Sequence, residues 1–147
     1  MIRAESEFTF VVHAPPAEAF PLFGPEGERP WAGPEWNPEF VYPASAKDEE
    51  GAVFRIRRRG QDEIWINTAF DAQEQYAAYV ALIPGRLVSR IAVRLRPIDA
   101  NTTQVHVTYV RTALDPSAYS EVAEMAQTDP TQGPEWENSI AEYLRKR

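Results

Sequence analysis

The sequence predicts an α+β fold in which an antiparallel sheet curves around a long C-terminal helix. A strand pattern occupies residues 5–13, strand patterns alone fill residues 52–113, and helical patterns fill the remainder to residue 147. Strands followed by a helix are typical of folds in which the helix covers one face of the sheet. The 147 residues suffice for one domain with its own core, and we assign residues 1–147 to a single domain.

The strands are predicted by apolar and polar side chains that alternate with a period of two. This alternation is clear in residues 5–13, 86–97 and 102–112, so each strand should have one covered face and one wet face. Arg59-Gly60-Gln61-Asp62 and Pro84-Gly85 are turn signals between strand patterns. The alternation and the turns together predict antiparallel hairpins.

The segment after the first strand has a different character. Pro15-Pro16 ends the strand, and the sequence through Phe23 fits one or two turns of helix opened by proline. Residues 24–43 combine glycine and proline with large aromatic side chains. Because such a segment is stiff and apolar, we expect it to pack onto the body of the domain.

The C-terminal part is predicted to be helical with one interruption. Asp115-Pro116 is a helix start, with Asp115 as a candidate cap, and an apolar stripe extends to about residue 127. Residues 129–134 interrupt the pattern, and a second helix is predicted for residues 135–147. This helix is the long amphipathic element available to cover the sheet.

Composition excludes several classes of function. The net charge of −7 disfavours binding to nucleic acid and to acidic lipid surfaces, because phosphate would be repelled. The absence of cysteine excludes disulfides, thiolate nucleophiles and cysteine metal sites. No run of about 18 apolar residues exists, and the charged N-terminus leads directly into a strand pattern. We therefore expect a cytoplasmic protein without integral membrane association.

A strongly twisted sheet cannot contact a single helix along its whole length, so a gap between them is expected. Gaps lined by aromatic side chains are where apolar small molecules bind. The sequence therefore favours an apolar small molecule as the partner of this protein.

The aromatic segment also carries a family resemblance. Phe23-Gly24-Pro25-Glu26-Gly27-Glu28-Arg29-Pro30-Trp31, with Trp36-Asn37-Pro38 and Pro43, resembles the START/birch-pollen-allergen-like helix-grip superfamily (SRPBCC), in particular its polyketide-cyclase-like branch. The further matches follow the family's order along the chain: Ala14-Pro15, Phe20, Gly51-Ala52-Val53-Phe54, Trp65, Tyr79, Pro84-Gly85, Thr103, Thr108-Tyr109 and Thr112-Ala113-Leu114.

The resemblance implies a helix-grip fold, with two short helices after the first strand and a hydrophobic cavity between the sheet and the C-terminal helix. It also implies binding of lipids, polyketides or other apolar molecules. The interruption at residues 129–134 departs from the family, in which this helix is often continuous.

The candidate ligand-binding residues are aromatic or lie on the apolar stripe of the C-terminal helix. They are Phe23, Trp31, Trp36, Trp65, Tyr76, Tyr109, Tyr119 and Met125. Ordinary core packing is the alternative interpretation for each of them. Tyr76 and Tyr79 lie on opposite faces of one predicted strand, so at most one of these two can face the cavity.

Few residues suggest catalysis. Arg94 and Arg111 are expected to face solvent, although an inward arginine would be a clamp for carboxylate or phosphate. His13 and His106 both alternate away from the apolar face, which predicts exposed positions. No nucleotide-binding, metal-binding or nucleophile motif occurs. We therefore predict no catalytic residue, no metal and no cofactor.

The leading hypothesis is a non-catalytic carrier or sensor of a hydrophobic small molecule. A cyclase or aromatase is the first alternative, since a cavity that positions a reactive chain could need only Tyr109, an arginine and water. A chaperone-type interaction protein is the second alternative and predicts an exposed apolar patch instead of an enclosed cavity. A homodimer is compatible with all three.

Overall fold

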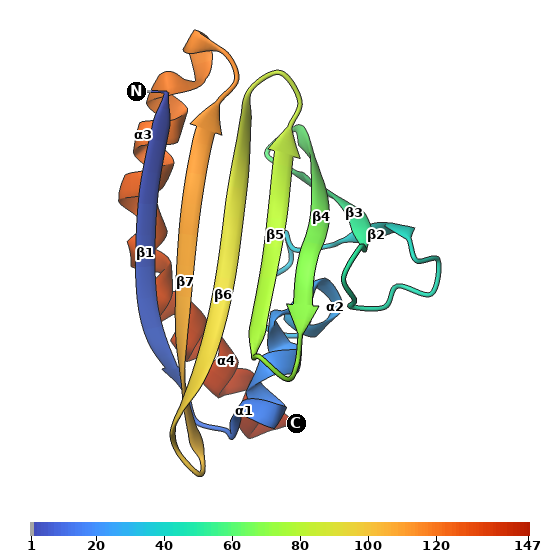
Figure 1. Ribbon diagram of the computed structural model, residues 1–147, viewed down its shortest axis with the longest axis vertical. Coiled ribbons are helices and arrows are strands. Elements are labelled where there is room, and N and C mark those ends of the chain that lie inside the picture. Colours follow the sequence, from blue (N-terminus) through green and yellow to red (C-terminus); the bar gives the residue numbers. More distant parts are fainter. Residues whose placement is uncertain (1) are drawn as a thin grey trace.

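The computed structural model describes residues 2–147, in which a curved antiparallel sheet lies against the C-terminal helices (Figure 1). The strands of this part of the chain are β1 (Arg3–Val12), β2 (Glu39–Tyr42), β3 (Val53–Arg58), β4 (Gln61–Asp71), β5 (Tyr76–Ile83), β6 (Leu87–Asp99) and β7 (Thr102–Ala113). They form one sheet in the order β1-β7-β6-β5-β4-β3-β2. The first strand therefore pairs with the last, and every other pair is consecutive in the sequence.

The alternation seen in the sequence sets which side chains face the helices. In β7 the odd-numbered residues from Thr103 to Ala113 are buried, and the residues between them are partly exposed. The hairpin between β3 and β4 turns at Arg59 and Gly60, which both have positive φ. Two successive residues with positive φ form a two-residue hairpin turn. β4 consequently begins at Gln61, two residues before the predicted start of this strand.

Short helical segments follow β1. They are α1 (Pro16–Ala19), the 3₁₀ helix η1 (Phe20–Phe23) and α2 (Pro25–Glu28). Proline in the first turn opens each of them. The sequence predicted such a helix up to Phe23, whereas the helical turn α2 falls in the segment expected to be rich in turns. The sequence did not predict β2, which pairs with β3 at the edge of the sheet and packs Phe40 against Phe54 at 5.6 Å between ring centroids.

The C-terminal region comprises the 3₁₀ helix η2 (Pro116–Ala118), α3 (Tyr119–Thr128), the 3₁₀ helix η3 (Asp129–Thr131) and α4 (Gln132–Lys146). The Asp115 carboxylate accepts a hydrogen bond from the Ser117 amide, as expected of a cap. The predicted interruption is only the single turn η3, and α4 begins at Gln132, three residues before the predicted start. Pro134 falls in the first turn of α4, where proline requires no broken hydrogen bond.

The core lies between the concave face of the sheet and these helices. A large cluster surrounds Phe8, Phe10, Phe20 and Phe54, and Trp136 of α4 packs edge-on against the rings of Phe8 and Phe10. A smaller cluster lies under α3 around Leu87 and Val122. The α+β class and the helix-grip arrangement predicted from the sequence are confirmed. Across residues 2–147, no helix is both long and apolar enough to cross a membrane.

Candidate functional site

A cavity of about 340 Å³ lies between the concave face of the sheet, the segment around α2, and helices α3 and α4. All four tryptophans of the chain, Trp31, Trp36, Trp65 and Trp136, line it. The volume is within the range of roughly 300–1,000 Å³ that is usual for small-molecule sites. The gap expected between sheet and helix therefore exists.

Hydrogen bonds from their indole nitrogens hold two of these tryptophans in place. The Nε1 groups of Trp31 and Trp36 donate to the carbonyl oxygens of Leu22 and Pro25, both at 2.9 Å. Trp36 contacts Trp65 edge-to-face with 5.3 Å between ring centroids, and Trp31 contacts Trp136 at 5.5 Å. These bonds fix the indole rings, so their apolar surfaces are available to a bound molecule.

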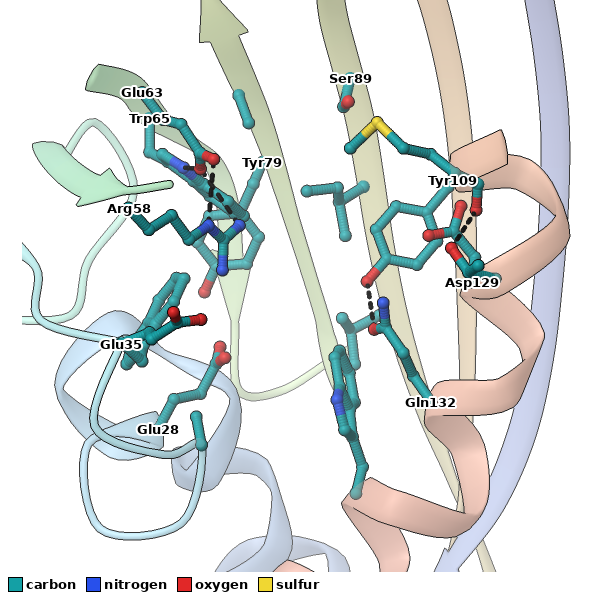
Figure 2. Close-up of a pocket in the computed structure, with 18 of the residues that line it drawn as sticks. Glu28, Glu35, Arg58, Glu63, Trp65, Tyr79, Ser89, Tyr109, Asp129 and Gln132 are labelled. Carbon is teal, nitrogen blue, oxygen red and sulfur yellow. Dashed lines mark hydrogen bonds and ion pairs between the residues drawn. The ribbon is translucent and has the colours of Figure 1, made fainter. Parts of the chain in front are cut away.

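Polar side chains gather on the side of the cavity formed by β3, β4 and β5 (Figure 2). Arg58 binds the Glu63 carboxylate with two nitrogens, Nε to Oε2 at 3.0 Å and Nη2 to Oε1 at 3.1 Å. Trp65 Nε1 also donates to Glu63 Oε1, at 2.9 Å. Glu63 is 8% exposed, and these three bonds compensate for the burial of its charge.

Glu28, at the end of α2, points into the same side of the cavity (Figure 2). Burial raises the pKa of its carboxyl well above the ordinary 4.5, and repulsion by Asp48 adds to this more than attraction by Arg58 opposes it. No hydrogen bond from residues 2–147 offsets this rise in pKa. Glu28 therefore holds its proton to a higher pH than an ordinary carboxyl group, and it lines the cavity where a bound molecule can reach it.

The raised pKa of Glu28 has a consequence for stability. The folded protein holds the Glu28 proton more tightly than the unfolded chain, which ionises near 4.5. The stability that the folded protein gains from holding this proton is fully present below pH 4.5. It is lost as the pH rises through the raised pKa.

Asp48 is held under α2 by the backbone. Its carboxylate accepts hydrogen bonds from the amides of Glu26 at 2.9 Å and Gly27 at 3.0 Å. A Cβ at Gly24 would lie 2.1 Å from Asp48 Oδ2, so glycine at this position permits the approach. The two hydrogen bonds lower the pKa of Asp48, although burial outweighs them and raises it overall.

Tyr79 joins the sheet to the segment that closes the cavity. Its hydroxyl donates to the Phe23 carbonyl oxygen at 2.6 Å, and the residue is 4% exposed. Burial raises the pKa of Tyr79 well above its ordinary value, and the charges of Glu28 and Asp48 raise it further. Tyr79 therefore acts as a hydrogen-bond donor that anchors η1 to β5.

The opposite side of the cavity is built from β7 and the turn between α3 and α4 (Figure 2). Arg111 binds the Asp129 carboxylate through Nε at 3.0 Å and Nη2 at 2.7 Å, and its Nη1 donates to Ser89 Oγ at 2.7 Å. Ser6 Oγ donates to Asp129 Oδ2 at 2.7 Å. The expectation that Arg111 faces solvent is therefore wrong, because it shares the parity of Tyr109 and is 7% exposed. The ion pair ties η3 to the sheet.

Tyr109 stands beside this ion pair. Its ring lies 4.4 Å from the Arg111 guanidinium carbon, and its hydroxyl is 3.3 Å from Gln132 Oε1. Burial is the main cause that raises the pKa of Tyr109 above its ordinary value. The hydroxyl therefore stays protonated, with only one long hydrogen bond to the protein.

Most of the aromatic candidates are brought together by the fold. The cavity wall contains Phe23, Trp31, Trp36, Trp65, Tyr109 and Met125. Tyr76 and Tyr119 lie outside it. Tyr76 is on the outer face of β5, where Arg94 stacks 4.5 Å from its ring centroid, and Tyr79 takes the inward position instead. Tyr119, the first residue of α3, packs into the smaller cluster under that helix.

The sequence did not point to most of the charged residues of the cavity, which are Glu28, Glu35, Arg58, Arg59, Glu63, Asp129 and Glu135. Parity offered a signal for Glu63, which lies two residues before Trp65 on the same face of β4. Glu28 and Asp129 lie in single helical turns, which are too short for a periodicity to indicate direction. His13 and His106 are not part of the cavity wall, and His106 lies 3.8 Å from Glu7 at the surface. Within residues 2–147, no three His, Asp or Glu side chains are grouped to hold a metal ion.

No family model and no curated protein sequence matches this chain. Solved structures do match. The crystal structure of Ara h 8.0201 is similar with a TM-score of 0.71 and 15% identity, covering 99% of both chains. Norcoclaurine synthase from Thalictrum flavum has a TM-score of 0.71 at 10% identity, covering 99% of this chain and 88% of that chain.

The Zhui aromatase/cyclase from Streptomyces sp. R1128 has a TM-score of 0.67 at 17% identity, covering 98% of this chain and 95% of that one. At such identities these likenesses establish the fold. The chain has the helix-grip fold of START/birch-pollen-allergen-like proteins, as the resemblance predicted.

Proposed function

We propose that this protein binds a small ring-bearing molecule with polar substituents in the cavity under the C-terminal helix, as a carrier or sensor. One observation carries the proposal: all four tryptophans of the chain line a single cavity of about 340 Å³. Indoles are costly to place around empty space, since their large apolar surfaces gain most from close packing. A flat apolar body would supply that packing.

The polar groups on the two sides of the cavity refine the expected ligand. Glu28 and Arg58 lie on one side, and Tyr109 and Gln132 lie on the other (Figure 2). Small-molecule sites typically combine apolar walls with a few polar groups that fix orientation. The occupant should therefore be amphipathic, with polar atoms that meet one or both of these sides, and not a plain hydrocarbon chain.

Filling the cavity tests this proposal. Ala81 of β5 faces the cavity, whereas Ala78 of the same strand faces outward. We expect Ala81→Phe to weaken binding of the uncharged fluorescent probe N-phenyl-1-naphthylamine by about tenfold or more, because the ring occupies the ligand volume. Ala78→Phe adds the same ring on the other face and should bind as wild type does.

Native mass spectrometry of the purified protein, with extraction of its contents, would identify a retained molecule. Equal binding by Ala81→Phe and wild type, or no binding by either, would contradict the proposal.

A cyclase or aromatase is a second candidate, favoured by the state of Tyr109. Its hydroxyl faces the cavity, keeps its proton and has only the 3.3 Å contact with Gln132. Such a group can donate to a ligand carbonyl oxygen and increase its reactivity. Turnover of a polyketone that is lost in Tyr109→Phe while binding is kept would support catalysis; turnover unchanged in this variant would remove Tyr109 from it.

A further inference from the structure

The cavity retains carboxyl groups in excess after its ion pairs are formed. Glu63 engages Arg58 with two bonds, and Asp129 engages Arg111 with two bonds. Glu28 and Glu35 also line the cavity, and Figure 2 draws no hydrogen bond or ion pair from either of them. Arg59 and Glu135 also line the cavity, so its wall contains five carboxyl groups and three guanidinium groups. An anionic ligand would compete with carboxylates for Arg58 and Arg111, whereas a cation would find carboxyl groups in excess.

The electrostatic potential around Glu28 is also negative, as the excess of carboxyl groups suggests. Repulsion by Asp48 outweighs attraction by Arg58 at the Glu28 carboxyl, and the charge of Asp48 also acts on the Tyr79 hydroxyl. Two groups on different elements thus experience a negative potential at this end of the cavity. Asp48 cannot turn away to relieve it, because the Glu26 and Gly27 amides hold both carboxylate oxygens.

We propose that the molecule bound in the cavity is an aromatic or cyclic amine in its protonated form, with Glu28 as its counter-ion. The inference rests on the proposed function and names the chemical class of the ligand. The indole rings of Trp31, Trp36 and Trp65 surround this end of the cavity, and aromatic faces attract cations as well as apolar rings. A single ligand with an ammonium group on a ring body would use both features.

Binding should be accompanied by proton release. The groups that face Glu28 are Glu35 and Asp48 from the loops, Arg58 from β3 and Tyr79 from β5. Without ligand these surroundings favour the protonated carboxyl. An ammonium group beside Glu28 would favour the carboxylate, so the proton would pass to the solvent.

Three matched probes test the inference by calorimetry at about pH 7: 2-phenylethylamine, 2-phenylethanol and 3-phenylpropionate. They share one ring and differ in charge. We expect the amine to bind about tenfold or more tightly than the alcohol, and the acid most weakly. Apparent binding enthalpies of the amine in phosphate and in Tris should differ because a proton is released, whereas those of the alcohol should agree.

The variant Glu28→Gln keeps the size of the side chain and removes its charge. It should lose the preference for amine over alcohol and the buffer dependence while it keeps binding of the alcohol. Glu124→Gln is the matched control, because Glu124 is exposed on α3 and lies outside the cavity wall. If Glu28→Gln fails to fold, the three probes and the comparison of buffers on the wild-type protein still test the inference.

Equal affinity for amine and alcohol, or preference for the acid, would overturn the inference and leave the cavity proposal intact. Binding of none of the probes, including N-phenyl-1-naphthylamine, would overturn both.

Discussion

The ion pair between Arg111 and Asp129 offers a strong test of how η3 is held to the sheet. Their side chains are 8% and 2% exposed, so both charges have lost nearly all of their water. Removing one partner from a buried pair costs about 3–5 kcal/mol, because the other charge is left uncompensated. Domain stabilities are only about 5–15 kcal/mol, so Arg111→Met should remove a large fraction of the total.

The measurement is urea unfolding followed by tryptophan fluorescence and by far-UV circular dichroism. In thermal unfolding, a loss of this free energy corresponds to a decrease in Tm of roughly 6–20 °C for a chain of this length. Asp129→Leu should be similarly destabilised. The double variant should recover most of the loss, because replacing a whole buried pair by apolar side chains is often close to neutral.

Glu142→Gln is the control, since Glu142 forms an exposed pair with Lys146 and should unfold close to wild type. A loss below about 1 kcal/mol in Arg111→Met, or losses in the single variants that simply add in the double variant, would refute the reasoning. Either result would mean that the pair is hydrated or uncoupled, and that packing alone forms the turn between α3 and α4.

Three further predictions concern the other side of the cavity. Glu28→Gln should be more stable than wild type by a margin that grows from pH 5 to pH 8 in urea unfolding, since the raised pKa makes the ionised carboxyl unfavourable; parallel pH profiles would contradict this. Tyr79→Phe should lose about 1–3 kcal/mol, because the buried Phe23 carbonyl oxygen loses its donor, whereas Tyr76→Phe on the outer face should lose little. Gly27→Ala should reduce both the melting temperature and probe binding, since a Cβ there would lie 1.7 Å from the Pro21 carbonyl oxygen, which cannot rotate away; a wild-type melting curve would show that α2 can shift freely.

Periodic segments were predictable from the sequence. The alternation in β7 placed Tyr109 inward beside Val105 and Val107, and the same parity applied to Arg111. We nevertheless expected Arg111 outside, because arginine is rarely buried without a partner. Its partner Asp129 lies 18 residues later, in a turn between two helices. The usual preference of arginine for solvent was therefore outweighed by the ion pair with Asp129, which no local sequence pattern indicates.

In β5 the sequence has no alternation of apolar and polar residues from which the inward face could be predicted. Its eight residues are all apolar, so the sequence alone allowed either Tyr76 or Tyr79 to face the cavity. Pairing with β6 decided the matter: Tyr79 lies opposite Ile91 and Tyr76 opposite Arg94. An exposed arginine on the neighbouring strand assigns Tyr76 to the outer face.

The sequence by itself determined the α+β class, the antiparallel hairpins, the helical C-terminal region and an aromatic-rich segment near residue 30, because these depend on local periodicity and turn chemistry. Only the tertiary structure decided that the cavity has charged sides. Glu28, Asp48 and Arg58 become neighbours through long-range packing, and burial and nearby charges shift the pKa values of Glu28 and Asp48. Those quantities exist only once the chain has folded.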